Sequence, residues 1–251
     1  MFPITHIWFS NTVLGYTNNL TVLGAIYSDA FISKHLTYDN THKCDWAFFD
    51  YIMKKNHEFS DFAKAIATHT VYPKGLDYYG DKQYLGSDGY CFQKAPLIVD
   101  DVIDACNLPI ELGLWKAHNF IEMAVEIEVI SANEKISQVF KEALLDNGIM
   151  NNLESLIEQY FNLIPGSLKN SFRKFESFAE ISDTNSYKMA LLYSSNMKRR
   201  HGISINVDKS SKIIDISREI INKDFKEFLN NVENRVKNMI ADRIDQYDKK
   251  E

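Results

Sequence analysis

Only ten glycines and five prolines interrupt the 251 residues of this chain. Because glycine and proline are the residues that most often end helices and form turns, their scarcity favours long helices over many short strands. The alternation of apolar and polar residues that is typical of a strand occurs only briefly, in residues 201–207, which could form a small hairpin or a loop. The sequence therefore predicts an all-α fold.

Helical spacing of apolar residues predicts helices along most of the chain, ending in one long amphipathic helix. The last helix should pack its apolar face on the bundle or, alternatively, on a partner. The expected ranges are 4–15, 20–33, 44–56, 58–70, 96–106, 110–131, 133–146, 149–163, 167–181, 184–199 and 209–247.

Composition narrows the class of protein. A hydrophobic content of 45% and a charged content of 25% are typical of a soluble globular chain. No apolar run approaches the ~20 residues that a transmembrane helix needs, and the net charge of -6 does not favour a protein that coats nucleic acid. Cys44, Cys91 and Cys106 are odd in number and widely spaced, and no signal-peptide pattern precedes them, so we expect free thiols in a cytoplasmic protein.

His118, Glu122 and Glu126 follow one another at four-residue spacing, which places an imidazole and two carboxylates in one row along a helix. Ile121 and Val125 fall close to the same face, so the row is expected to point inward. Buried carboxylates need a compensating cation, a lysine or arginine, or a shared proton. The row can therefore bind a metal, although a solvated or ion-paired face is the other interpretation of such spacing.

Three more polar residues lie on apolar stripes of predicted helices. Asp29 continues the apolar face of the helix over 20–33, and His69 continues that of the helix over 58–70. His6 precedes an apolar segment near the chain start. Each could be a core residue satisfied by the backbone, but together with the first row they favour one shared metal site.

The order of these motifs resembles that of the zinc-dependent phospholipase C and P1-nuclease superfamily. The resemblance covers about the first half of the chain and rests on Thr5-His6, on the segment ending at Asp29, on Ala67-Thr-His69 followed by Pro73, and on His118-x-x-x-Glu122. It implies an all-helical bundle that clusters zinc ions to cleave phosphoric esters. It also implies that His6, Asp29, His69, His118 and Glu122 hold one or two metal ions.

Two departures from that family lower the expected number of ions. Secreted members use the amino group of an N-terminal tryptophan as a ligand, whereas this chain begins Met1-Phe2-Pro3-Ile4, so that ligand is not expected. The family's next histidine after the His-x-x-x-acid pair is also missing. Glu126 is then either a further ligand or the general base.

The segment Val71–Ala95 is the expected exception to helix, because it combines several tyrosines with glycines and aspartates. Such composition is typical of a long irregular loop, and long loops in compact domains are often functional. The loop is either a surface excursion or a wall of the substrate site. In the second case Asp77 contacts metal or substrate, and Tyr78 and Tyr79 bind substrate.

Basic residues near the end of the helix over 184–199 offer a second substrate contact. Arg199 and Arg200 could bind a phosphate, since guanidinium groups match its oxygens. The alternative is that they complement the dipole of their own helix. His35, His42 and His57 lie among polar residues and are expected at the surface.

These patterns favour a zinc-dependent hydrolase of phosphoric esters in one helical domain. Residues 1–131 would form the metal-binding core, and residues 133–251 a helical extension packed on it. The substrate would be a small phosphorylated molecule or a phospholipid headgroup. The alternatives are a helical di-iron oxygenase, with iron in place of zinc, and a non-catalytic binding or scaffolding protein with a buried polar network.

Overall fold

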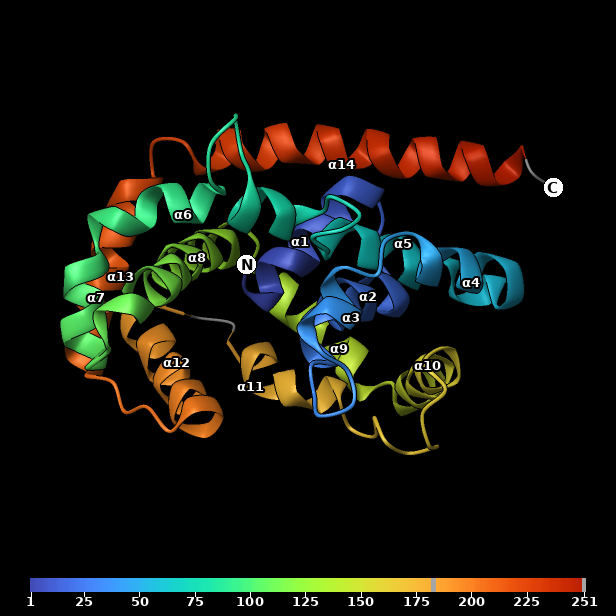
Figure 1. Cartoon of the computed structure of the whole chain (residues 1–251), viewed down its shortest axis with the longest axis horizontal. Helices are drawn as coiled ribbons and strands as arrows, with labels where there is room; N and C mark the ends of the chain where they lie inside the picture. Colours follow the sequence, from blue (N-terminus) through green and yellow to red (C-terminus); the bar gives the residue numbers. More distant parts are fainter. Residues whose placement is uncertain (182–183, 250–251) are drawn as a thin grey trace.

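The computed structural model describes residues 1–181 and 184–249, and the regular elements in these ranges are all helices (Figure 1). The all-α prediction is confirmed. The residues between 201 and 207 that could have formed a hairpin are a loop that joins two helices. The search for a membrane-spanning helix among the described residues found none that is long and apolar enough.

The longer helices are α1 (Pro3–Leu14), α2 (Asn19–Ala30), α4 (Ala47–Lys55), α5 (Ser60–His69), α7 (Val99–Cys106), α8 (Gly113–Ala132), α9 (Ile136–Leu145), α10 (Asn147–Tyr160), α12 (Ser186–His201), α13 (Val207–Ile221) and α14 (Phe225–Asp248). Short turns of helix connect them: α3 (Tyr38–His42), η1 (His57–Phe59), η2 (Tyr78–Lys82), α6 (Tyr90–Lys94), η3 (Ala95–Leu97), η4 (Ile110–Leu112), η5 (Phe172–Phe175) and α11 (Glu176–Ala179).

Helix α8 lies at the centre of the bundle. It packs against α1, α6, α7 and α13, and most of its twenty residues are buried. A helix that is apolar on nearly all sides must be enclosed by other helices. The few polar side chains on α8 are therefore carried into the interior, where each needs a partner.

Among the described helices α2 and α5 share the most extensive contact, and α1 packs against both. The approach depends on Gly24 in α2, where a Cβ would lie 2.5 Å from the carbonyl oxygen of Phe62 in α5. An Asn18 cap, which accepts a hydrogen bond from the Thr21 amide, fixes the start of α2. The pair places Asp29 near His69, because each lies close to the last turn of its helix.

The prediction of a single helix over 209–247 was wrong, because α13 ends at Ile221 and α14 begins at Phe225. The amide of Asp224 donates to the carbonyl of Ile221 at 3.0 Å, which closes a turn. The Asp224 carboxylate accepts hydrogen bonds from Tyr90 at 2.6 Å and Lys94 at 2.7 Å. These contacts tie the break to α6, and α14 then runs along one side of the molecule across α1 and α5 (Figure 1).

Three other segments differ from the sequence prediction. The helix expected over 167–181 is reduced to the short η5 and α11, preceded by turns in which Asn170 has a φ of 66°. The expected irregular loop over 71–95 contains η2 and α6, so part of it is coiled into helical turns. Helix α3 was not expected at all.

The packing of α2 on α5 gives a first testable prediction. Replacing Gly24 by alanine should lower the free energy of unfolding by about 1–3 kcal/mol, because the added methyl group would force the two helices apart. Gly148 near the start of α10 is the matched control, since a Cβ there would meet only Asp146 Oδ1 at 3.5 Å. Urea unfolding of both alanine variants measures the difference. Equal stability of the two would show that α2 and α5 can separate at little cost.

Candidate metal centre

Three helices bring His6, Asp29 and His69 together in the interior. One ligand-type atom from each lies within 4.8 Å of the others. The rings of His6 and His69 are stacked, with centroids 3.5 Å apart and planes 5° apart. Both imidazoles are buried. Three residues predicted from separate helices therefore share one location.

Asp77 lies at the middle of this group. Its Oδ1 is 3.2 Å from His6 Nε2, and its Oδ2 is 3.1 Å from His69 Nε2. These approaches lack the geometry of hydrogen bonds, since both nitrogens remain without a hydrogen-bond partner in the described structure. Buried nitrogen and oxygen atoms that lie this close together without hydrogen bonds are unsatisfied, and a cation bound between them would satisfy them. Asp77 had been predicted to contact metal or substrate.

The orientation of His69 suits a metal ligand. Its Nδ1 lies 2.6 Å from the carbonyl oxygen of Ala25. A carbonyl only accepts, so Nδ1 carries a proton, and in the neutral ring Nε2 is left with the lone pair that can bind a metal. Metal-binding histidines are commonly held in this way by a second partner on the other ring nitrogen.

His42 belongs to the same group, although it was expected at the surface. It is 1% exposed, and its Nε2 lies 3.6 Å from both Asp29 Oδ1 and Asp77 Oδ2. Its Nδ1 is 2.9 Å from Thr41 Oγ1. The sequence does contain a signal for its position, because Thr37 and Asn40 form a capping box that starts α3. That helix turns His42 inward.

A second group consists of Asp81, His118 and Glu122, whose ligand-type atoms also lie within 4.8 Å of one another. His118 is stacked on Phe92 with centroids 4.3 Å apart. Asn119 donates a hydrogen bond from Nδ2 to Glu122 Oε2 at 3.1 Å, and the same atom lies 3.0 Å from His118 Nε2. Asp81 was not predicted, because the turn of η2 that places it was expected to be irregular.

The amino group of Met1 lies between the two groups. It is 3.0 Å from Asp77 Oδ1 and 2.8 Å from Glu122 Oε1. An amino group had not been expected at the site. In this arrangement a single cation links the two carboxylates, which shows that the groups are adjacent parts of one centre.

Burial and neighbouring charges set the protonation of these groups. Burial, and then the charge of His69, lower the pKa of His6 to about 4. Burial alone would also lower the pKa of His69, but the carboxylates of Asp77 and Asp29 outweigh it and raise this pKa. Burial raises the pKa of Asp81 well above its usual value. Burial opposes ionisation of Asp77 as well, yet the Met1 amino group and the imidazoles hold its pKa well below the usual range.

Glu126, the third member of the row on α8, is directed at the first turn of α1. Its Oε1 accepts the Ile4 amide at 2.8 Å, and its Oε2 accepts both the amide and the hydroxyl of Thr5 at 2.6 Å. The carboxylate thus caps α1, whose own preceding residue offers no side-chain cap. Burial raises the pKa of Glu126 to about 7 despite these bonds. Glu126 orients the helix that carries His6.

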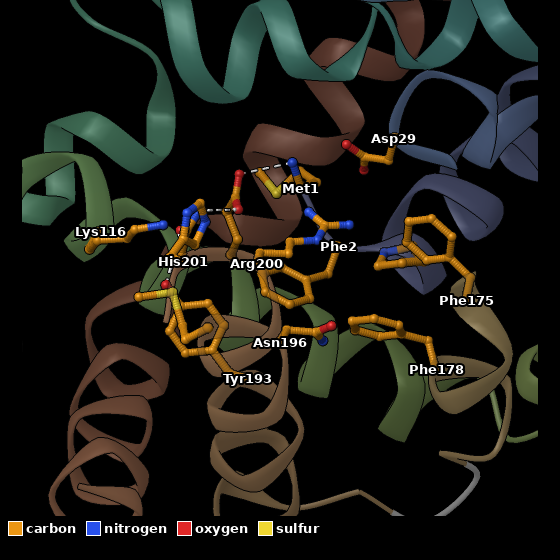
Figure 2. A pocket seen from close by; sticks show the side chains of 14 residues that line it. Met1, Phe2, Asp29, Lys116, Phe175, Phe178, Tyr193, Asn196, Arg200 and His201 are labelled. Atoms are coloured by element: carbon orange, nitrogen blue, oxygen red, sulfur yellow. Dashed lines mark hydrogen bonds and ion pairs between the residues drawn. The ribbon is translucent and has the colours of Figure 1, made fainter. Parts of the chain in front are cut away.

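A cleft with a volume of about 170 Å³ opens beside the centre and is lined by Asp29 and Glu122 among others. Figure 2 shows Lys116 and His201 on one side of it and Phe175 and Phe178 on the other. The cleft can therefore accept a molecule that is both anionic and partly apolar.

Of the four predicted substrate-binding residues, one lines the cleft and three do not. Arg200 lines the cleft, whereas Arg199 does not and instead donates a hydrogen bond to Asn196 at 2.9 Å. Tyr78 and Tyr79 do not line it either. Tyr78 donates its hydroxyl to Gln83 at 2.7 Å and packs edge-on against Tyr79.

No family model, no curated protein and no solved structure matches the chain. The function is therefore inferred from the chemistry of the centre and its cleft.

The cap on α1 gives a second prediction. Replacing Glu126 by glutamine at about pH 8, where the carboxylate is ionised, should lower the free energy of unfolding by about 1–3 kcal/mol. The side-chain NH2 group of glutamine cannot accept a hydrogen bond, so backbone amides in the first turn of α1 that now donate to the carboxylate would lose an acceptor.

The control is Glu128→Gln, which removes a half-exposed ion pair with Arg218 and should cost less than about 1 kcal/mol. Chemical denaturation measures both variants. A Glu126→Gln protein as stable as Glu128→Gln would contradict the capping role.

Proposed function

We propose that the protein is a metal-dependent hydrolase of phosphoric esters, with zinc as the metal. The observation that supports this most strongly is the gathering of eight ligand-type side chains, mostly buried, beside one cleft. They are His6, Asp29, His42, His69, Asp77, Asp81, His118 and Glu122.

The donor set fits zinc. Imidazole nitrogens and carboxylate oxygens are the ligands that zinc takes in catalytic sites, where one position stays open for water or substrate. Four ring nitrogens among these histidines are buried without a hydrogen-bond partner in the described residues: both nitrogens of His6, His69 Nε2 and His118 Nδ1. Two of them, Nε2 of His6 and Nε2 of His69, lie beside the Asp77 carboxylate. A bound cation would satisfy them and would neutralise the carboxylates that surround them.

The eight side chains would hold up to two ions, one for each neighbouring group. His6, Asp29, His42, His69 and Asp77 would serve the first. Asp81, His118 and Glu122 would serve the second, where fewer protein ligands leave more room for substrate.

A bound zinc ion supplies a water whose pKa falls toward ~7, and it polarises a phosphoryl oxygen. The protein contributes the remaining requirements. Asp29 and Glu122 line the cleft, so an ester entering it would reach the centre. Lys116 and Arg200 would add positive charge to the cleft, which favours entry of an anionic substrate, and Phe175 and Phe178 would pack on its organic part. In the reaction a water oxygen bonds to phosphorus and the ester oxygen leaves with a proton as an alcohol.

Metal content tests the proposal. Protein purified without added metal should contain zinc by mass spectrometry and should hydrolyse bis(p-nitrophenyl) phosphate. His69→Ala should lose most of the metal and most of the activity, because this imidazole belongs to two overlapping ligand groups. His57→Ala is the control, since His57 is exposed and lies outside these groups. A wild-type protein that binds no zinc and hydrolyses no ester would overturn the proposal.

Stability should depend on metal and pH together. At about pH 8 a chelator should lower the melting temperature, because it removes a cation that binds only the folded chain. The carboxylates of Asp77 and Asp29 raise the pKa of His69, so as pH falls its imidazole takes up a proton earlier than an ordinary histidine does, and the proton then competes with zinc. At about pH 5 the chelator should then make little difference. If the chelator changes the melting temperature at neither pH, the buried polar residues form a network that contains no metal.

A further inference from the structure

One wall of the cleft carries basic side chains that form no ion pair within the described residues. Lys116 near the start of α8 and Arg200 and His201 at the end of α12 line this wall. Lys116 is only 3% exposed, and its ammonium lies 3.6 Å from the centroid of the Trp115 ring. Neither Lys116 nor Arg200 has a carboxylate within ion-pair distance in residues 1–181 and 184–249. A buried ammonium without an anion is costly, so this wall is suited to an anionic ligand.

The wall and the metal centre are different parts of the cleft. Lys116 and His118 are two residues apart on α8, and side chains at this spacing point to opposite sides of a helix. Arg200 and His201 come from α12, which contributes none of the ligand-type side chains. An anion bound by Lys116 and Arg200 therefore occupies a place separate from the phosphoryl group that reacts.

The chemistry of the three side chains favours a phosphate. An arginine presents paired donors that match two phosphate oxygens, and a lysine adds a compact positive charge. His201 adds ring nitrogen atoms and lies edge-on against Trp115, with centroids 5.9 Å apart. The phenylalanines across the cleft are suited to the organic part that would join two phosphates (Figure 2).

We propose that Lys116, Arg200 and His201 form a subsite for a second phosphate group, so that the preferred substrate is a phosphodiester that carries a further phosphate. This inference rests on the proposed hydrolase function for the reacting ester. The anion subsite itself can be tested without any reaction.

The first experiment measures binding of inorganic pyrophosphate to chelator-treated protein by calorimetry. The wild type should bind it, and Arg200→Gln and Lys116→Met should each weaken binding about tenfold, because each loses a charge-assisted contact. Lys198→Gln is the matched control, since it removes an exposed charge from the same helix end outside the cleft and should bind like the wild type.

Circular dichroism checks that the variants are folded. If Lys116→Met is unfolded, Arg200→Gln decides the outcome, because Arg200 is exposed and its loss should not disturb packing. No binding by the wild type, or equal binding by wild type and Arg200→Gln, would overturn the subsite.

The second experiment uses zinc-loaded protein and two probes. One is the p-nitrophenyl phosphodiester of ethylene glycol, and the other is the same ester with a phosphate on the free hydroxyl. The wild type should show a KM about tenfold lower for the phosphorylated probe, and Arg200→Gln should remove this difference whereas Lys198→Gln keeps it. Equal KM values in the wild type would contradict the proposal. If neither probe is hydrolysed, the hydrolase function fails, and the pyrophosphate titration still decides the subsite.

Discussion

The meeting of Asp77 with three imidazoles is the contact on which the arrangement of this protein depends. A carboxylate is not stable in a dry interior unless cations or hydrogen-bond donors surround it. Here His6, His42 and His69 all lie within 3.6 Å of its oxygens, and the Met1 amino group completes the surroundings. The helices that carry these imidazoles, α1, α3 and α5, therefore have to pack so that the imidazoles and the Met1 amino group surround the carboxylate. The constraint on charge is thus also a constraint on the fold.

Much of this centre could be predicted because its residues break a pattern. Asp29 and His69 occupy positions where helical periodicity calls for an apolar residue, and His118 and Glu122 lie on α8, most of whose residues are buried. A polar residue on an apolar stripe is costly unless it has a partner, so the sequence itself indicates that partners exist. The sequence does not say which residues pair, because that depends on how the helices cross.

The residues that were missed have a common cause. His42 and Asp81 lie on α3 and η2, which are too short to show a periodic pattern. Glu126 was recognised as inward-facing, but its row drifts around α8 by roughly 40° at each step, and the last step reaches α1 instead of the centre. The break before α14 was missed for a similar reason, since its side-chain contacts with α6 are more than a hundred residues away in sequence. Periodicity describes local structure, whereas these positions are set by tertiary contacts.

The metal centre and part of the cleft draw on different parts of the chain. The ligand-type side chains come from residues before Glu126. The cleft takes Phe2 and Lys116 from the same part of the chain, but Phe175, Phe178, Arg200 and His201 come from η5, α11 and α12. A metal centre tolerates little displacement, because its ligands must converge within a few tenths of an ångström. The cleft wall has no such limit, since a flexible arginine can follow a ligand. Changes in α11 and α12 would therefore alter the lining of the cleft while the centre stays intact, so the charge of that lining bears on the substrate that is proposed for it.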